Sequence, residues 1–274
     1  MNKNLPKAVI VSISSDIGYC LAKRWQQRGM QVAGTYRTPS FLVEDLNEEG
    51  VKTFQCDLSE AGSVSDACAK LYGDLGLWDY LVLCPGTLEP VGAFAKVDFK
   101  EWEKSLEVNF IRQMQFVREL LPSRNKNGAH PPVVLFFAGG GTNNATENFS
   151  AYTVSKIALI KMCELLDAEI PDTSFVILGP GWVKTKIHQA TLQAGDRAGA
   201  DYQKTKTKID GDEGTPMENV LDCCDWLVKA DRKTVSGRNF SVVFDQWGTE
   251  ALIKKLEQDP HLYKLRRQGN DWKP

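Results

Sequence analysis

Tyr152 and Lys156 stand four residues apart in the run from Ser150 to Lys156. Four residues is about one turn of an α-helix, so both side chains would lie on the same face of a helix. A free phenol has a pKa of about 10, but a neighbouring ammonium favours the phenolate and lowers that pKa. The pair therefore predicts a proton donor or acceptor for a carbonyl or alcohol group. The same spacing arises by chance on surface helices, so its interpretation depends on the rest of the chain.

Other residues that could do chemistry form no comparable pattern. The three histidines, His130, His188 and His261, are scattered, and the seven cysteines lack metal-site spacing. We therefore expect no metal site, and we interpret Cys223 and Cys224 as core thiols in a helix-like stretch. Trp182 could stack on a substrate ring or pack against a lid formed by the residues that follow it. His188 could touch substrate, but we expect it to face solvent.

Composition excludes several function classes. The 274 residues carry a formal net charge of −2, with 42% hydrophobic and 25% charged residues, as in an ordinary globular protein. This charge favours neither nucleic acid nor an anionic membrane as a partner. No apolar run approaches the roughly 20 residues needed to cross a bilayer, and the N-terminus lacks a secretory pattern. We expect a cytoplasmic protein that acts on a small molecule.

Strand-like and helix-like segments alternate along the chain and would position the Tyr152 pair. Apolar runs predict strands at residues 8–13, 31–36, 51–55, 80–84, 133–137, 174–178 and 239–244. Amphipathic stretches between them predict helices at 17–28, 41–49, 64–72, 99–121 and 150–170. Strands that are apolar on both faces indicate a parallel sheet covered on both sides. The predicted fold is a single Rossmann-type, doubly wound α/β sheet of about seven strands.

Two segments break this alternation. Residues 186–214 are polar and rich in Lys, Gly and Asp, and they follow the sixth strand. We expect a mobile lid there, over the carboxyl edge of the sheet. Residues 1–247 would form the nucleotide-binding domain that includes this lid, and residues 248–274 a tail that is either a subunit contact or a solvated end.

The loop after the first strand runs from Ser12 to Gly18 into a predicted helix. The N-terminus of a helix favours phosphate, because its backbone N–H groups are free and its dipole is positive there. As a glycine-rich motif the loop is poor, and an ordinary helix cap by Ser15 or Asp16 is the alternative reading.

With this loop, the chain resembles the short-chain dehydrogenase/reductase family over residues 7–246. The loop keeps Ile17-Gly18 of the family's Thr-Gly-x-x-x-Gly-Ile-Gly pattern but has Ser12 and Asp16 where glycines are usual. Asn109 matches the active-site asparagine, and Tyr152 with Lys156 matches the catalytic pair. The resemblance implies that Tyr152 is the proton donor, that Lys156 lowers its pKa and holds the ribose, and that Asn109 orders a water linking Lys156 to solvent.

The same resemblance implies a nicotinamide cofactor site. Asp57 would contact adenine, Cys84-Pro-Gly86 takes the place of Asn-Ala-Gly, and Thr185 would touch the nicotinamide amide. The implied cofactor-binding residues are Ser12, Ser14, Ser15, Ile17, Gly18, Arg37, Asp57, Leu58, Cys84, Gly86, Asn109, Tyr152, Lys156, Pro180, Gly181, Val183 and Thr185. Family members pair through helices such as 99–121 and 150–170, which implies a homodimer or homotetramer.

The residue after the second strand indicates which cofactor is preferred. A carboxylate there would bind the ribose 2′-hydroxyl, whereas an arginine suits a 2′-phosphate. The sequence has Arg37 and no carboxylate at this point. An exposed arginine without a ligand is the alternative, but we expect NADP(H) rather than NAD(H).

The family's usual serine, about thirteen residues before the tyrosine, is absent. Ala138 or Gly139 stands there, in a run that continues through three glycines to Thr142. Thr142, the Asn143 amide or a backbone N–H could take the role of the serine. Alternatively, the protein binds nucleotide without turnover, as a sensor or partner subunit, or it modifies a sugar or nucleotide sugar. We expect an active NADP(H)-dependent oxidoreductase of carbonyl or alcohol substrates, with Tyr152, Lys156, Asn109 and Thr142 at its catalytic site.

Overall fold

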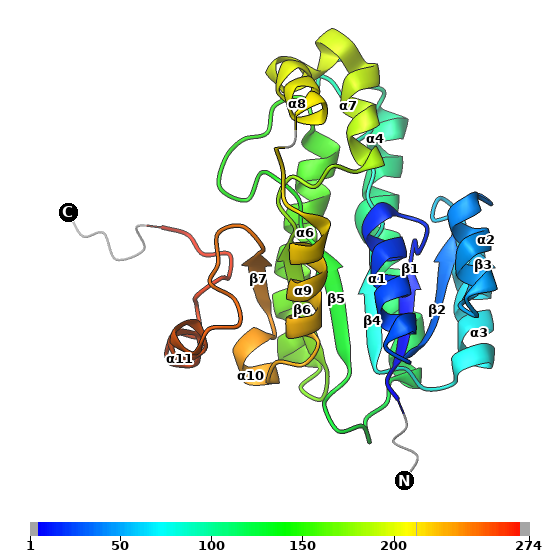
Figure 1. The fold of residues 1–274 in the computed structure, drawn as a ribbon. Helices are drawn as coiled ribbons and strands as arrows, with labels where there is room; N and C mark the ends of the chain where they lie inside the picture. The colour runs from blue at the N-terminus through cyan, green and yellow to red at the C-terminus, as the bar shows by residue number, and fades with distance from the viewer. Residues whose placement is uncertain (1–4, 212, 269–274) are drawn as a thin grey trace.

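Seven parallel strands form one sheet in the order β3-β2-β1-β4-β5-β6-β7 (Figure 1). The computed structural model describes residues 5–211 and 213–268. The strands are β1 (Lys7–Val11), β2 (Gln31–Tyr36), β3 (Lys52–Gln55), β4 (Tyr80–Leu83), β5 (Val133–Phe137), β6 (Ser174–Gly179) and β7 (Arg238–Ser241). The strand order reverses between β1 and β4, where such sheets bind their ligands at the carboxyl edge.

Helices cover both faces of the sheet, which confirms the predicted doubly wound architecture. On one face α1 (Asp16–Gln27) packs against α9 (Met217–Leu227). On the other, α3 (Ala61–Leu75) contacts α5 (Arg112–Leu120), and α6 (Ser150–Glu169) lies against β6. The remaining helices are α2 (Phe41–Glu48), α4 (Phe99–Leu106), α7 (Gln189–Ala194), α8 (Ala200–Asp210), α10 (Arg232–Val235) and α11 (Glu250–Gln258). No helix in the described part of the chain is long and apolar enough to cross a membrane.

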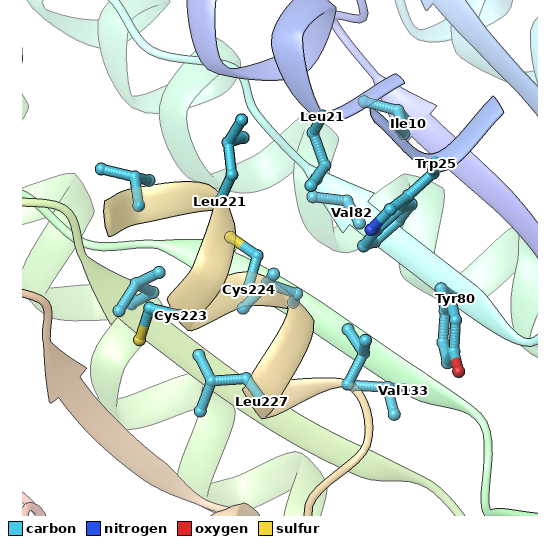
Figure 2. Packing of buried hydrophobic residues seen from close by; sticks show 14 of the residues in the cluster. Ile10, Leu21, Trp25, Tyr80, Val82, Val133, Leu221, Cys223, Cys224 and Leu227 are labelled. Atoms are coloured by element: carbon cyan, nitrogen blue, oxygen red, sulfur yellow. The ribbon is translucent and has the colours of Figure 1, made fainter. Parts of the chain in front are cut away.

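Two apolar cores lie on the two faces of the sheet because strand side chains alternate between them. In β1, Ile10 belongs to one core, while Val9 and Val11 belong to the other. Figure 2 shows the core under α9, where Cys223 and Cys224 lie among apolar side chains from the sheet and from α1. Both thiols are buried and free, so their interpretation as core thiols is confirmed.

The helix predicted at 99–121 contains an irregular turn. α4 leads into a π-helical turn, η1 (Glu107–Ile111), then into α5 and a short 3₁₀ turn, η2 (Leu121–Ser123). In η1 the Arg112 N–H donates to the Glu107 carbonyl five residues earlier, rather than four. Such turns are rare and occur frequently at functional sites, and this one contains Asn109.

Residues 186–210 are helical rather than the mobile loop that their polar composition predicts. The order is η3 (Lys186–His188), α7, η4 (Gly195–Ala198) and α8. Figure 1 places α7 and α8 at the end of the molecule toward which the strands point. A few buried side chains, including Thr191, Ala194 and Ala198, fix these short helices to the body of the protein. Because the chain is otherwise polar there, its hydropathy resembles that of a loop.

The C-terminal region folds back onto its own chain as far as it is described. Leu252 and Leu256 of α11 are buried in the core. The buried Arg238 guanidinium donates to the carbonyls of Leu256 at 2.7 Å, Asp259 at 3.1 Å and Leu262 at 2.5 Å. Over residues 250–258 the tail is therefore not a solvated end, because α11 packs into the core and bonds Arg238 of β7. β7 ends at Ser241, earlier than the predicted 244, and Phe244 is exposed.

Candidate active site

Tyr152 and Lys156 lie in the first two turns of α6, and the Lys156 Nζ is 5.8 Å from the centre of the Tyr152 ring. The Lys156 side chain is only 3% exposed. Its ammonium donates to the Pro85 carbonyl at 3.2 Å and to the Phe137 carbonyl at 3.0 Å. These carbonyls follow β4 and end β5, so two neighbouring strands position the lysine at the carboxyl edge of the sheet.

Burial dominates the ionisation of this pair. It raises the pKa of Tyr152 to about 12 and lowers the pKa of Lys156 to about 8. The expectation that the ammonium lowers the pKa of Tyr152 is therefore wrong for this structure. The physical reason is that the ammonium bonds two backbone carbonyls, while removal from water disfavours the charged form of both side chains.

Asn109, in the π turn, holds the loop after β4. Its side-chain oxygen accepts from the Thr87 N–H at 2.9 Å, and its side-chain nitrogen donates to the Thr87 carbonyl at 2.9 Å and the Ser105 hydroxyl at 3.2 Å. Its backbone carbonyl accepts from the Gln113 side chain at 2.7 Å. Sequence reasoning missed Gln113; a polar residue on the apolar face of a predicted helix was the available signal.

Of the two positions at which the serine is expected, Gly139 is the one that faces Tyr152. A Cβ atom added to Gly139 would lie 2.5 Å from the tyrosine hydroxyl oxygen and 2.6 Å from the ring. Ala138 is buried in the core on the α6 side of the sheet instead. Among the residues that the structure describes, neither the Thr142 hydroxyl nor the Tyr152 phenol oxygen makes a hydrogen bond.

The loop between β1 and α1 is compact despite its missing glycines. Ser12 adopts φ = 59°, the left-handed region that glycine favours. The Ser15 hydroxyl caps α1 by accepting from the Gly18 N–H at 3.1 Å. A Cβ on Gly18 would lie 2.7 Å from the Ser12 carbonyl oxygen, so a larger residue would open the loop.

Residues 186–210 bond directly to this loop. The Asp16 carboxylate accepts from the Lys186 N–H at 2.9 Å, and the Lys186 ammonium donates to the Ser14 carbonyl at 2.6 Å. One cation and one anion therefore lie beside the first turn of α1. A glycine-rich phosphate loop predicts neither an aspartate nor a lysine at this point, and Lys186 was not among the expected site residues.

Arg37 and Asp57 lie at the ends of β2 and β3. Arg37 is exposed, and its guanidinium makes no ion pair within residues 5–211 and 213–268. One oxygen of Asp57 accepts from the Ser59 N–H and hydroxyl, each at 2.8 Å. The Ser59 N–H is the main reason why the pKa of Asp57 is lowered. Leu58 next to it is buried.

The segments after β4 and β6 complete the edge of the site. Burial raises the pKa of the Cys84 thiol to about 12. A Cβ on Gly86 would lie 3.4 Å from Ile187 and 3.9 Å from the Lys156 Nζ, so the backbone approaches the site closely there. Gly181, between Pro180 and the buried Val183, has φ = 76°, and Thr185 precedes η3.

An apolar cluster lies beside Tyr152, beneath residues 186–210. Its buried members come from the loop after β4, the start of α6 and the segment 186–210: Leu88, Val91, Phe149, Ala194 and Ala198. Tyr152, Ile187, Ala190 and Tyr202 pack against it. We call these residues the apolar cluster.

Trp182 and His188 hold the segment 186–210 from outside the apolar cluster. Their rings stack 4.3 Å apart, and the Lys208 ammonium lies 5.4 Å from the Trp182 ring centre. The His188 Nε2 is 2.9 Å from the Val183 carbonyl oxygen, and burial lowers the pKa of His188. The expectation that His188 faces solvent is therefore wrong. Trp182 packs against neighbouring protein, as one of its two readings required.

No group of three or more His, Cys, Asp or Glu within the described residues could hold a metal ion. The positively charged and donor groups at the carboxyl edge instead suit phosphates and hydroxyl groups. They are the Arg37 guanidinium, the Lys186 and Lys156 ammonium groups and the first turn of α1. The Asp16 carboxylate, which also lies in the first turn of α1, would repel an anion. The donor groups together suit a nucleotide.

Comparisons with known proteins give a consistent result. The family model for short chain dehydrogenases matches residues 6–195. An uncharacterised oxidoreductase of Schizosaccharomyces pombe is 26% identical over 193 residues, which cover 68% of this chain and 75% of that protein. Human dehydrogenase/reductase SDR family member 4 is 26% identical over 192 residues, covering 66% and 67%.

Solved structures share the fold. The KRED1-Pglu enzyme has a TM-score of 0.77 at 22% identity, covering 85% of this chain and 99% of its own. A variant of actinorhodin polyketide ketoreductase, solved with NADPH, has a TM-score of 0.74 at 17% identity and covers 87% and 95%.

Proposed function

Because the chain belongs to the short-chain dehydrogenase/reductase family, whose curated relatives are oxidoreductases, we propose that it is an NADP(H)-dependent oxidoreductase of carbonyl and alcohol substrates. The observation that carries this proposal is the buried Lys156 beside the half-buried Tyr152, at the carboxyl ends of β4 and β5. Tyr152 packs against the apolar cluster, and the groups that we propose bind phosphate lie at the same edge of the sheet.

Each part of the nucleotide has residues suited to hold it. Arg37 would bind the 2′-phosphate, because a guanidinium offers paired donors in the geometry of phosphate oxygens. The first turn of α1 and Lys186 would bind the diphosphate, and Lys156 the ribose hydroxyl groups. Asp57 would contact adenine, and Thr185 the nicotinamide amide. When bound, the nicotinamide supplies the hydride.

Tyr152 acts as the proton donor to the carbonyl oxygen. With a pKa raised to about 12, its phenol is protonated at neutral pH. A protonated phenol can donate to a carbonyl, whereas alcohol oxidation requires the phenolate. In the free protein, Tyr152 therefore has the protonation state that reduction of a carbonyl requires. The charge of Lys156, when its ammonium is drawn toward Tyr152, would oppose the effect of burial on the phenol.

Without a serine, another donor must stabilise the oxygen that becomes negative. We assign this role to a backbone N–H of the glycine run after β5 or to the Thr142 hydroxyl. Backbone donors in a water-poor site are effective because they need no reorganisation. A Thr142→Val variant separates the two: unchanged turnover leaves the backbone as donor, and a large loss assigns Thr142.

The apolar cluster supports an apolar substrate. Leu88, Val91 and Phe149 are 9% exposed or less, and Tyr152 packs against the cluster that they form. A hydrocarbon or aromatic group beside the reacting carbonyl would contact these side chains once residues 186–210 move aside, and would then keep them from water. We propose that residues 186–214 act as a lid over this substrate, within a nucleotide-binding domain of residues 1–247.

The first test compares Tyr152→Phe with Tyr202→Phe, which removes a hydroxyl elsewhere in the same neighbourhood. NADPH oxidation is followed with a panel of aldehydes and ketones of increasing apolar size. We expect Tyr152→Phe to lose at least about 100-fold in turnover, the usual contribution of a general acid, and to bind NADPH as the wild type does. Retained turnover would remove Tyr152 from the proposed role.

Fluorescence titration with NADPH and NADH tests the cofactor. We expect the wild type to bind NADPH more tightly and Arg37→Ala to lose that preference. Tighter binding of NADH by the wild type would contradict the assignment. NADPH binding without oxidation of any panel member would favour the second candidate, a nucleotide sensor, which the absence of a side chain at Gly139 supports.

We also propose that two copies pair through α4–α6, where Ile111, Val154 and Leu165 are 46%, 50% and 45% exposed. Exposed apolar side chains on neighbouring helices suit an interface between copies. A monomer at all concentrations in sedimentation equilibrium would contradict this.

The free thiols of the chain suit the reducing cytoplasm, which cell fractionation can test.

A further inference from the structure

Gln113 is a fully buried amide at the base of the candidate active site. It follows Asn109 by four residues, at the point where the π turn passes into α5. Its side-chain nitrogen donates to the Asn109 carbonyl at 2.7 Å and to the Pro85 carbonyl at 3.4 Å. Its side-chain oxygen is buried and has no hydrogen-bond partner among the described residues.

The orientation of this amide follows from its neighbours. Exchanging its oxygen and nitrogen would set three carbonyl oxygens together without a hydrogen between them. The nitrogen therefore faces Asn109 and Pro85, and the unpaired oxygen faces away from both. An unpaired buried carbonyl is unfavourable, so Gln113 is not explained as an ordinary stabilising residue of the core.

Gln113 and Lys156 share one acceptor. The Pro85 carbonyl receives the Lys156 ammonium at 3.2 Å as well as the Gln113 amide. A continuous chain of groups thus runs from the Asn109 carbonyl through Gln113 and Pro85 to Lys156. An amide nitrogen donates hydrogen bonds but does not accept them, unlike a water molecule, which does both. This chain therefore holds its groups in place without offering a path for protons.

We propose that Gln113 is a positioning residue: its amide occupies the place of a water between the Asn109 carbonyl and Lys156, and thereby closes Lys156 to solvent on that side. The part of this proposal that concerns turnover rests on the proposed function, whereas the part that concerns the ionisation of Lys156 does not. It replaces the expectation, drawn from the family, that Asn109 orders a water linked to Lys156. In this chain the Asn109 carbonyl bonds Gln113 instead.

The surroundings of Lys156 agree with a closed site. In the described part of the chain, two titratable groups face it: Tyr152, one turn earlier on α6, and Cys84, at the end of β4. Burial raises the pKa of both, so both are neutral at pH 7. No carboxylate offsets the burial of the lysine, and its pKa falls to about 8. A water admitted beside the ammonium would raise that pKa, because it would solvate the charged form.

Two substitutions separate exclusion of water from simple packing. Gln113→Ala opens space for a water beside two carbonyl acceptors, whereas Gln113→Met fills the same volume with an apolar chain. Gln115→Met is the matched control, because Gln115 lies on the same helix and bonds Ala61 and Ser65 outside the site. If the Gln113→Ala protein does not fold, Gln113→Ser is used in its place.

The first readout needs neither cofactor nor turnover. The ionisation of Lys156 is followed through the pH dependence of urea unfolding between pH 7 and 10.5, each variant being compared with the same variant carrying Lys156→Met. We expect Gln113→Ala to move the Lys156 titration upward by about one pH unit, a usual size for such an environmental change. We expect Gln113→Met and Gln115→Met to leave it within about 0.3 unit of the wild type.

The second readout is the pH profile of kcat with NADPH. The alanine variant should show the same upward displacement, with KM for NADPH within about twofold, because the site that binds the nucleotide is intact. The proposal would be overturned if the Lys156 titration and the kcat profile moved equally in the alanine and methionine variants, or moved in neither. An inactive wild type would refute the proposed function but leave the unfolding readout of Gln113 unaffected.

Discussion

Replacing Lys156 with methionine should stabilise the folded protein at neutral pH, and the gain should shrink as the pH rises. Lys156 is 3% exposed, and burial lowers its pKa from 10.5 to about 8. Below pH 8 the lysine is charged in both the folded and unfolded states, so the cost of burying the charge is fully present. Above pH 10.5 it is neutral in both states, and that cost is gone.

The size of the effect follows from the two pKa values. At about 1.4 kcal/mol per pH unit, the fall from 10.5 to about 8 costs about 3 kcal/mol of folding free energy at pH 7. At pH 9.5 about 1.4 kcal/mol of that cost remains, because the folded state has lost its proton and the unfolded state has not. The stability difference between Lys156→Met and wild type should therefore narrow by about 2 kcal/mol over this range.

Equilibrium urea unfolding at pH 7.0, 8.0, 9.0 and 9.5 measures this difference directly. Groups other than Lys156 titrate alike in both proteins and cancel. Lys161→Met is the control, because Lys161 lies on the same helix but is exposed and paired with Glu164. A difference that stays constant from pH 7 to 9.5 would refute the reasoning, since it would mean that Lys156 is not a buried charge.

Two further predictions concern the loop between β1 and α1. Ser12→Gly should raise the free energy of unfolding by about 1 kcal/mol, because φ = 59° is unfavourable for serine; a lower urea midpoint would show instead that the serine side chain contributes more than the strain costs. Lys186→Ala should weaken NADPH binding by roughly tenfold in low salt and less in high salt, since it removes the ammonium beside the loop. Lys184→Ala, an exposed neighbour, is the control, and equal effects of the two substitutions would contradict a specific role.

The sequence predicts the sheet well because its strands are buried on both faces. Runs such as 133–137 are apolar without interruption, and only a sheet covered on both sides buries such residues completely. The break in the helix at 107–111 has no such signal, since residues of these types also occur within regular helices. The segment 186–210 was misjudged for the opposite reason: a few small buried residues hold short helices whose surface is polar.

At the candidate site, sequence patterns identify residue types but not their bonds. The spacing of Tyr152 and Lys156 predicts a shared helix face, yet the acceptors of Lys156 are backbone carbonyls that no side-chain pattern encodes. Gln113 was overlooked because its importance lies in its burial and its partners. Lys186 was overlooked because its partners, Ser14 and Asp16, lie about 170 residues earlier in the chain.

The contact between Gly139 and Tyr152 also constrains how this protein can change. The tyrosine hydroxyl oxygen lies only 2.5 Å from the point where the Cβ of a side chain at position 139 would stand. A serine at position 139 therefore requires the Tyr152 ring to move, and that ring packs against the apolar cluster. A side chain at position 139 thus requires a coordinated set of changes rather than one substitution. An engineered serine there would be introduced last, after the residues around the ring had been altered.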